Sequence, residues 1–124
     1  MNVRIVHEQG RVPVTIFYLE GQLNLGSSAQ LEQMARAEFD NGMRDLLIDL
    51  SETSSLTSAG LRTLLVLDRL LDNPASHAGG DPLKSSHLKV LNVPPHLQRV
   101  IQIAGFDIFI DSYDDLPTAI ASFG

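Results

Sequence analysis

Short apolar runs alternate along the chain with segments in which apolar residues recur every three or four positions. The first two runs, Val3–His7 and Val12–Leu19, are rich in β-branched residues, and Gln9-Gly10 separates them. Two such runs joined by a short turn predict a β-hairpin. Because proline cannot donate a ladder hydrogen bond, Pro13 indicates that the second strand starts at or near a sheet edge.

A helix is predicted after the hairpin, because apolar residues recur there at helical spacing. These positions are Leu31, Met34, Ala35 and Phe39. Gly21 and Gly26 indicate a loop before the helix. Ser27 lies three positions before Gln30, a capping-box spacing that places the start of the helix, and Asn41-Gly42 ends it.

The rest of the chain alternates strands with helices. The expected strands are Leu46–Leu50, Leu88–Val93 and a short extended piece at Phe106–Ile110. The expected helices run from Ser58 to about Asp72, from Pro95 to Gly105, and, with Pro117 in the first turn, to Phe123. Between them we interpret Ser51–Ser55 as a polar loop and Asn73–Ser86 as a flexible surface loop rich in turn-forming residues.

This order of elements predicts an α/β fold. Strands that alternate with helices after a hairpin imply right-handed crossovers and mainly parallel pairing. We therefore expect a single mixed β-sheet of about four to five strands with about four helices packed against it. The 124 residues are the length of one domain, so we expect a single domain over residues 1–124.

The composition excludes several classes of function. The chain has no cysteine, which excludes disulfides and cysteine-based sites, and its four histidines are dispersed, so we expect no metal site. Nine basic against fifteen acidic residues give a net charge of −6, which disfavours nucleic-acid binding. The sequence has no apolar run of the ~20 residues that a membrane span needs and no apolar signal segment, so we expect a cytoplasmic protein. It also lacks a glycine-rich phosphate loop, and we expect neither a cofactor nor enzymatic activity.

The segment Asp49–Leu61 is unusual because it places six hydroxyl side chains between a strand and a helix. Serine and threonine are good helix N-caps, which accounts for one or two of them. Ala59 and Gly60 then leave the start of the helix uncluttered, although glycine lowers helix propensity by about 1 kcal/mol relative to alanine. A phosphate on a serine at this point would meet the positive end of the helix dipole, a favourable interaction of about 0.3–1 kcal/mol. It would add a charge of about −1.5 to −2, enough to disrupt a protein contact without refolding the domain.

The same residues resemble the signature of a known family. The string D-L-S-x-x-x-x-L-T-S-A-G-L, which ends at Leu61, resembles the pattern D-(L/F)-S-x-x-x-x-(I/M)-D-S-S-G-L of STAS domains, the anti-sigma factor antagonist family. Three further segments resemble the family's loop after the second strand, its strand–turn–helix unit and its final helix. These segments are Leu19–Asn24, Leu88–Phe106 and Tyr113–Ala121. The resemblance covers nearly the whole chain in the same order of elements and implies one STAS domain with the STAS fold.

The resemblance implies a binding module and not an enzyme. Family members bind an anti-sigma factor of the histidine-kinase-like ATPase fold, which frees a sigma factor. That partner phosphorylates a serine in the matching loop and breaks the complex, and a phosphatase restores it. Carried onto this chain, the resemblance implies that Ser58 is the phosphorylated residue. The partner-binding residues that it implies are Gln22, Asn24, Thr57, Ser58, Ala59, Gly60 and Leu61.

Four positions depart from the family's pattern. Thr57 replaces the aspartate before the acceptor, Ala59 replaces the second serine, and Gln22 and Asn24 replace a glutamate and an aspartate in the earlier loop. Thr57 is therefore either an alternative phosphorylation site or only a helix cap. The loss of three acidic positions also leaves a second function open. In that alternative the chain is a STAS scaffold subunit, not phosphorylated, of a stress-signalling complex or of a lipid or anion transporter.

Overall fold

The computed structural model describes residues 1–71 and 87–124. Its strands are β1 (Asn2–Gln9), β2 (Pro13–Leu23), β3 (Leu46–Asp49), β4 (Thr53–Leu56), β5 (Leu88–Leu91) and β6 (Asp111–Tyr113). Its helices are α1 (Leu25–Asp40), α2 (Ser58–Leu71), α3 (Pro95–Ile103) and α4 (Leu116–Ala121), with a 3₁₀-helix at Phe106–Ile108. The expected loop Asn73–Ser86 lies outside the described residues.

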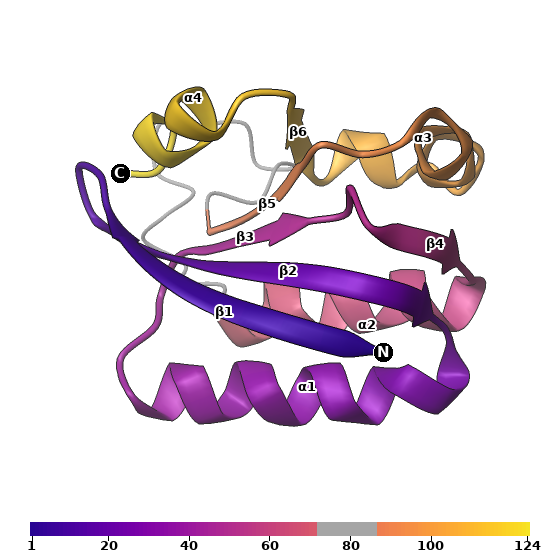
Figure 1. Cartoon of the computed structure of the whole chain (residues 1–124), viewed down its shortest axis with the longest axis horizontal. Coiled ribbons are helices and arrows are strands. Elements are labelled where there is room, and N and C mark those ends of the chain that lie inside the picture. The colour runs from indigo at the N-terminus through magenta and orange to yellow at the C-terminus, as the bar shows by residue number, and fades with distance from the viewer. Residues whose placement is uncertain (72–86) are drawn as a thin grey trace.

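The strands form one mixed sheet in the order β1-β2-β3-β5-β6 (Figure 1). Strand β1 is antiparallel to β2, and each other pair of described strands is parallel. Strand β2 is long enough to pair first with β3 and then with β4, which continues along β2 beyond the end of β3. The predicted α/β class, the initial hairpin and the mixed sheet are confirmed.

Helices cover both faces of the sheet. Helices α1 and α2 lie against one face and α4 against the other (Figure 1). The alternation along β2 accounts for both layers, because Phe17 and Leu19 are buried under α1 and α2 while Val14 and Ile16 are buried under α4. Strand β3 is buried along its whole length, as the apolar run that contains it predicts.

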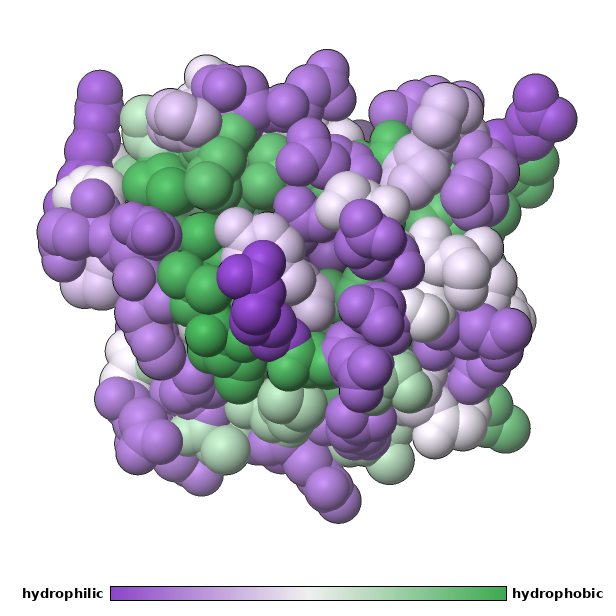
Figure 2. Space-filling model, viewed as in Figure 1, coloured by the Kyte–Doolittle hydropathy of each residue, from purple (hydrophilic) through white to green (hydrophobic). Residues whose placement is uncertain are grey.

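Helix α4 packs closely against the tip of the β1–β2 hairpin. A Cβ atom on Gly10 would lie 2.6 Å from Cγ2 of Ile120, so this contact requires glycine. The helix covers only part of its face of the sheet. Apolar side chains remain visible beside it, over the region between α4 and the hairpin (Figure 2).

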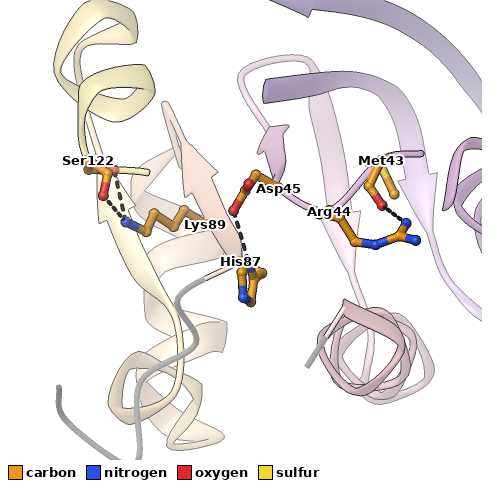
Figure 3. A network of polar contacts seen from close by, with 6 residues as sticks. All are labelled: Met43, Arg44, Asp45, His87, Lys89 and Ser122. Carbon is orange, nitrogen blue, oxygen red and sulfur yellow. Dashed lines mark hydrogen bonds and ion pairs between the residues drawn. The ribbon is translucent and has the colours of Figure 1, made fainter. Parts of the chain in front are cut away.

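A buried lysine joins the central sheet to the end of α4. Lys89 on β5 is only 6% exposed, and its Nζ donates hydrogen bonds to the carbonyl and the hydroxyl oxygen of Ser122, each at 2.9 Å (Figure 3). Burial lowers the pKa of Lys89 from its ordinary value, although Asp111 and Asp45 act in the opposite direction. Beside it, Nδ1 of His87 lies 2.8 Å from Oδ1 of Asp45.

The sheet contains six strands because β4 forms where the sequence predicts a polar loop. Thr53 is 2% exposed, and its hydroxyl donates a 2.8 Å hydrogen bond to the carbonyl of Leu19 on β2. The side chains of Ser54 and Ser55 carry no apolar signal. The strand therefore depends on its pairing with β2, a contact between segments that are distant in the sequence.

Two other boundaries differ from the predictions. Helix α1 begins at Leu25, because Asn24 and not Ser27 is its N-cap, and Ser27 is the third residue of the helix. The piece Phe106–Ile110 is not extended. Its first three residues form a 3₁₀-helix after Gly105, which has a φ of 77°, and the strand β6 begins only at Asp111.

Candidate functional site

The starts of α1 and α2 lie side by side at the carboxyl end of β2. Strand β4 pairs with the end of β2, so that Gln22 is opposite Ser55 and Leu23 is opposite Leu56. Each helix begins within two residues of this pairing, and both run back along the sheet in the same direction (Figure 1). The hydroxyl-rich segment and the earlier Gln22–Asn24 loop are thereby brought together, as the resemblance implies.

A turn centred on Asp49 leads the chain into this region. The Oδ1 atom of Asp49 accepts hydrogen bonds from the Ser51 amide at 2.8 Å and from the Ser51 hydroxyl at 2.6 Å. Its Oδ2 atom accepts a 3.2 Å hydrogen bond from Nδ2 of Asn92. Asp49 is 3% exposed, so these donors are what allows its carboxylate to be buried. The D-L-S part of the motif therefore has a structural role, which is to connect β3 to β4.

Thr57 caps helix α2. Its hydroxyl accepts a 3.3 Å hydrogen bond from the Gly60 amide, and its carbonyl accepts one from the Leu61 amide at 2.9 Å. The Thr57 amide donates to the carbonyl of Leu23 at 3.1 Å, and the hydroxyl lies 3.5 Å from the same oxygen. An aspartate can accept the same capping hydrogen bond. Threonine at this position therefore retains the cap but lacks the charge.

Ser58 is the first residue of α2, and it is exposed. Within residues 1–71 and 87–124 its hydroxyl forms no hydrogen bond, in contrast to that of its neighbour Thr57. Neither α1 nor α2 has an acidic residue in its first turn, so no carboxylate there opposes a negative charge at this point. The Ser58 hydroxyl is accessible to another protein and is not required for the local fold.

Gly60 is needed for packing and not for access, which corrects the sequence interpretation. A Cβ atom at this position would lie 2.5 Å from the carbonyl oxygen of Leu23 and 2.9 Å from Cδ1 of Leu56. Leu61 is 5% exposed and belongs to the core under the sheet. Gly60 and Leu61 thus fix the position of α2 from inside the molecule. They offer a partner almost no surface, whereas Ala59 is partly exposed.

Gln22 and Asn24 lie next to this helix start. Asn24 caps α1 through a reciprocal pair of hydrogen bonds: its Oδ1 accepts from the Ser27 amide at 3.2 Å, and its own amide donates to the Ser27 hydroxyl at 3.0 Å. Nδ2 of Asn24 donates to Oε1 of the exposed Gln22 at 3.1 Å. Asn24 therefore has a structural role of its own, and Gln22 has the freer side chain.

A surface groove between α1 and α2 contains two further residues that the sequence analysis did not select. Its lining includes Leu25, Ser28, Glu32, Ser58, Ala59 and Arg62. Leu25 is 80% exposed, which is unusual for a leucine, and it follows directly after the cap of α1. It was missed because the segment around it was interpreted as a loop. Arg62 lies four residues after Ser58, and this spacing is the signal that would have identified it.

A family model of the STAS domain matches residues 4–74, which run from Arg4 in β1 through α2 and include the whole hydroxyl-rich segment. The chain belongs to the STAS domain family. BtrV of Bordetella bronchiseptica, a proposed anti-sigma factor antagonist, is 28% identical to this STAS protein over 105 residues, which are 85% of this chain and 82% of BtrV.

Two solved structures share the fold of this STAS protein. An anti-sigma factor antagonist from Mycobacterium paratuberculosis matches 96% of this chain and 94% of its own, with a TM-score of 0.71 and 23% identity. The phosphorylated form of the Bacillus cell fate determinant SpoIIAA matches 96% of each chain, with a TM-score of 0.63 and 18% identity. At these identities the likeness establishes the fold.

The described residues contain neither a cluster of metal-binding side chains nor a membrane-spanning helix. No group of three or more histidine, aspartate or glutamate side chains is placed to hold a metal ion in residues 1–71 and 87–124. None of the helices in this part of the chain is long and apolar enough to cross a membrane.

Proposed function

We propose that this STAS protein is an anti-sigma factor antagonist whose activity is controlled by phosphorylation of Ser58. It binds an anti-sigma factor serine kinase of the histidine-kinase-like ATPase fold in the cytoplasm, and this binding releases a sigma factor. The relative BtrV supports the class of function. The exposed hydroxyl of Ser58, next to a Thr57 hydroxyl that is engaged in the helix cap, is the observation that supports the site.

The kinase, and not this chain, catalyses the transfer of the phosphoryl group. The Ser58 oxygen attacks the γ-phosphorus of ATP, the bond from that phosphorus to the β,γ-bridging oxygen breaks, and ADP leaves. The hydroxyl proton passes to a base of the kinase. A phosphatase then hydrolyses the phosphoserine and restores the hydroxyl. Thr57 is the poorer acceptor, because a phosphate on its oxygen would remove the hydrogen bond that caps α2.

The proposed contact surface surrounds Ser58. Of the residues that the resemblance implies, Gln22, Thr57, Ser58 and Ala59 have exposed or partly exposed side chains, and Asn24 is half-buried. Gly60 and Leu61 act from beneath, since they hold α2 in place. The exposed side chain of Leu25 is the apolar group that such an interface places at its centre.

Phosphorylation is tested with the anti-sigma factor kinase and Mg-ATP. Peptide mass spectrometry should find one phosphoryl group, on Ser58. The Ser58→Ala variant should remain unmodified, and Ser54→Ala, which removes another exposed hydroxyl from the same segment, should be modified at the wild-type rate. A kinase that binds the chain and hydrolyses ATP but leaves Ser58 unmodified would overturn the proposed switch.

Binding provides the second test. Titration calorimetry with the kinase should give equal affinities for the wild type and Ser58→Ala, and a weaker affinity for Ser58→Asp, because the added carboxylate opposes the contact as a phosphate does. Equal affinities for Ser58→Ala and Ser58→Asp would exclude charge at Ser58 as the control.

The loss of acidic residues around Ser58 favours a second candidate, an unphosphorylated STAS scaffold subunit. Thr57 and Asn24 keep helix-capping roles without a charge, so the fold is preserved while the acidic character of the family's site is lost. Such a subunit would co-purify with a stress-signalling assembly or a transporter and carry no phosphate on Ser58. Recovery of a kinase of the ATPase fold together with phosphorylated Ser58 would reject this candidate.

A further inference from the structure

Arg62 lies one helical turn after Ser58 on α2, and the two exposed residues line the same groove. Side chains of an α-helix point back toward its N-terminus, so the long side chain of Arg62 extends over the turn that Ser58 begins. We propose that Arg62 is the positioning residue that holds a phosphate on Ser58. This inference rests on the proposed function and adds to it the side chain that binds the phosphate once Ser58 carries it.

The guanidinium of Arg62 is available for this role. Within residues 1–71 and 87–124 it forms no ion pair, hydrogen bond or ring contact. Some of the other arginines already have a partner. Arg36 pairs with Glu32 at 3.8 Å, and Arg44 donates hydrogen bonds to the carbonyls of Phe39 and Met43. Arg62 can therefore turn to a new anion without giving up an existing partner.

The surroundings of Ser58 favour this pairing. The three family positions that are acidic elsewhere are the neutral Gln22, Asn24 and Thr57 here, so they do not compete with a phosphate for the guanidinium. Glu32 on α1 lines the same groove and is the carboxylate that could compete. Its pairing with Arg36, one turn further along α1, reduces that competition.

The pairing changes what phosphorylation does at this surface. A phosphoserine carries about −1.5 to −2 charges, so an adjacent guanidinium leaves a local charge of about −0.5 to −1. An arginine also holds phosphate oxygens through two parallel hydrogen bonds, which fixes the position of the group. In this chain, phosphorylation therefore places an ordered, partly neutralised group on the contact surface and removes a free cation from it.

The test uses chain in which phosphoserine is incorporated at position 58 during synthesis, so that no kinase is needed. The second ionisation of the phosphate, which lies near pH 6, is followed by ³¹P NMR. Because a neighbouring cation favours the dianion, Arg62→Gln should raise this pKa by about 0.5 unit at low salt, and the difference should shrink as salt is added. Arg62→Lys should recover part of the shift. The control is Arg69→Gln, since Arg69 lies on the same helix but about 16 Å along its axis from Ser58.

The outcomes separate this inference from the proposed function. The same phosphate pKa in the wild type and Arg62→Gln would overturn the inference, and so would an equal shift in Arg69→Gln. Far-ultraviolet circular dichroism of each variant shows whether it is folded, and the exposed position of Arg62 predicts that all are. Failure of a kinase to modify Ser58 would instead overturn the proposed function and would not affect this titration.

Discussion

Replacing Gly60 with alanine tests how closely α2 approaches the end of β2. In an ordinary helix this substitution stabilises the protein, since alanine has the higher helix propensity by about 1 kcal/mol. Here the added Cβ would lie 2.5 Å from the backbone carbonyl of Leu23 and 2.9 Å from Cδ1 of Leu56. The leucine side chain can rotate away, but the carbonyl is part of β2 and cannot move without disturbing the sheet. The helix must therefore shift.

The expected magnitude follows from two opposing contributions. Overpacking of a close contact destabilises a protein by about 1–3 kcal/mol. Because the added Cβ meets the backbone carbonyl of Leu23, we expect the upper part of this range, about 2–3 kcal/mol. The gain in helix propensity offsets about 1 kcal/mol of it, so Gly60→Ala should lower the free energy of unfolding by about 1–2 kcal/mol. With an m-value of about 2 kcal/mol/M, the middle of the usual range for urea, the midpoint should fall by roughly 0.5–1 M. A shifted helix also lengthens the hydrogen bond from the Thr57 amide to Leu23, which is now 3.1 Å.

Urea denaturation and amide hydrogen exchange measure these effects. The matched control is Ala59→Gly at the adjacent position, which changes helix propensity in the opposite direction and adds no atom. Both variants should be less stable than the wild type, although propensity alone predicts opposite signs for them. Exchange of the Thr57 amide should be faster in Gly60→Ala. If Gly60→Ala proved as stable as the wild type, the close approach of α2 to β2 would be refuted.

Three other predictions follow from the same structure. Thr57→Ala should lower the free energy of unfolding by about 1 kcal/mol through loss of the cap, whereas Thr57→Asp retains a capping oxygen and should not; urea denaturation tests both. Leu25→Ala should change the free energy of unfolding by less than about 0.5 kcal/mol but weaken the affinity for the anti-sigma factor, measured by calorimetry, about tenfold. Ile103→Ala, which is similarly exposed on α3, should leave this affinity unchanged. The pKa of Lys89 is lower in the folded state, so just below the ordinary lysine pKa the unfolded chain binds more protons than the folded chain. In that alkaline range, urea denaturation should show the wild type gaining stability relative to Lys89→Met as the pH rises.

Local sequence patterns were sufficient to predict the elements whose own residues show a clear periodicity or turn signal. The hairpin, the buried strand β3 and the start of α2 at Ser58 all follow from periodicity and turn residues, and the structure confirms them. Strand β4 could not be predicted this way, because the stabilising partner of Thr53 is the carbonyl of Leu19, 34 residues earlier. Short polar strands depend on such pairing more than on their own composition.

The sequence predicted that the hydroxyl-rich segment and the Gln22–Asn24 loop lie together, but not how the residues of the first turn of α2 pack. Leu61 repeats with Leu64 at core spacing, a pattern that already indicates burial, yet the resemblance placed it on the contact surface. Gly60 was interpreted as a means of access, because its sequence context does not reveal that the Leu23 carbonyl lies above it. Leu25 was missed for the converse reason, since nothing local indicates that a leucine beside a helix cap is left exposed.

Different residues in the first turn of α2 hold the fold and face the partner, which explains how a modification there can act without unfolding the domain. Thr57 caps the helix, and Gly60 and Leu61 fix it against the sheet from inside. The Ser58 hydroxyl makes no hydrogen bond in the described part of the chain, so a phosphate on it displaces no side-chain contact of the fold. The change is confined to the surface that Ser58 shares with Arg62. A partner that binds this surface therefore meets a different charge and shape on an unchanged backbone, and that is the physical requirement for a switch based on binding alone.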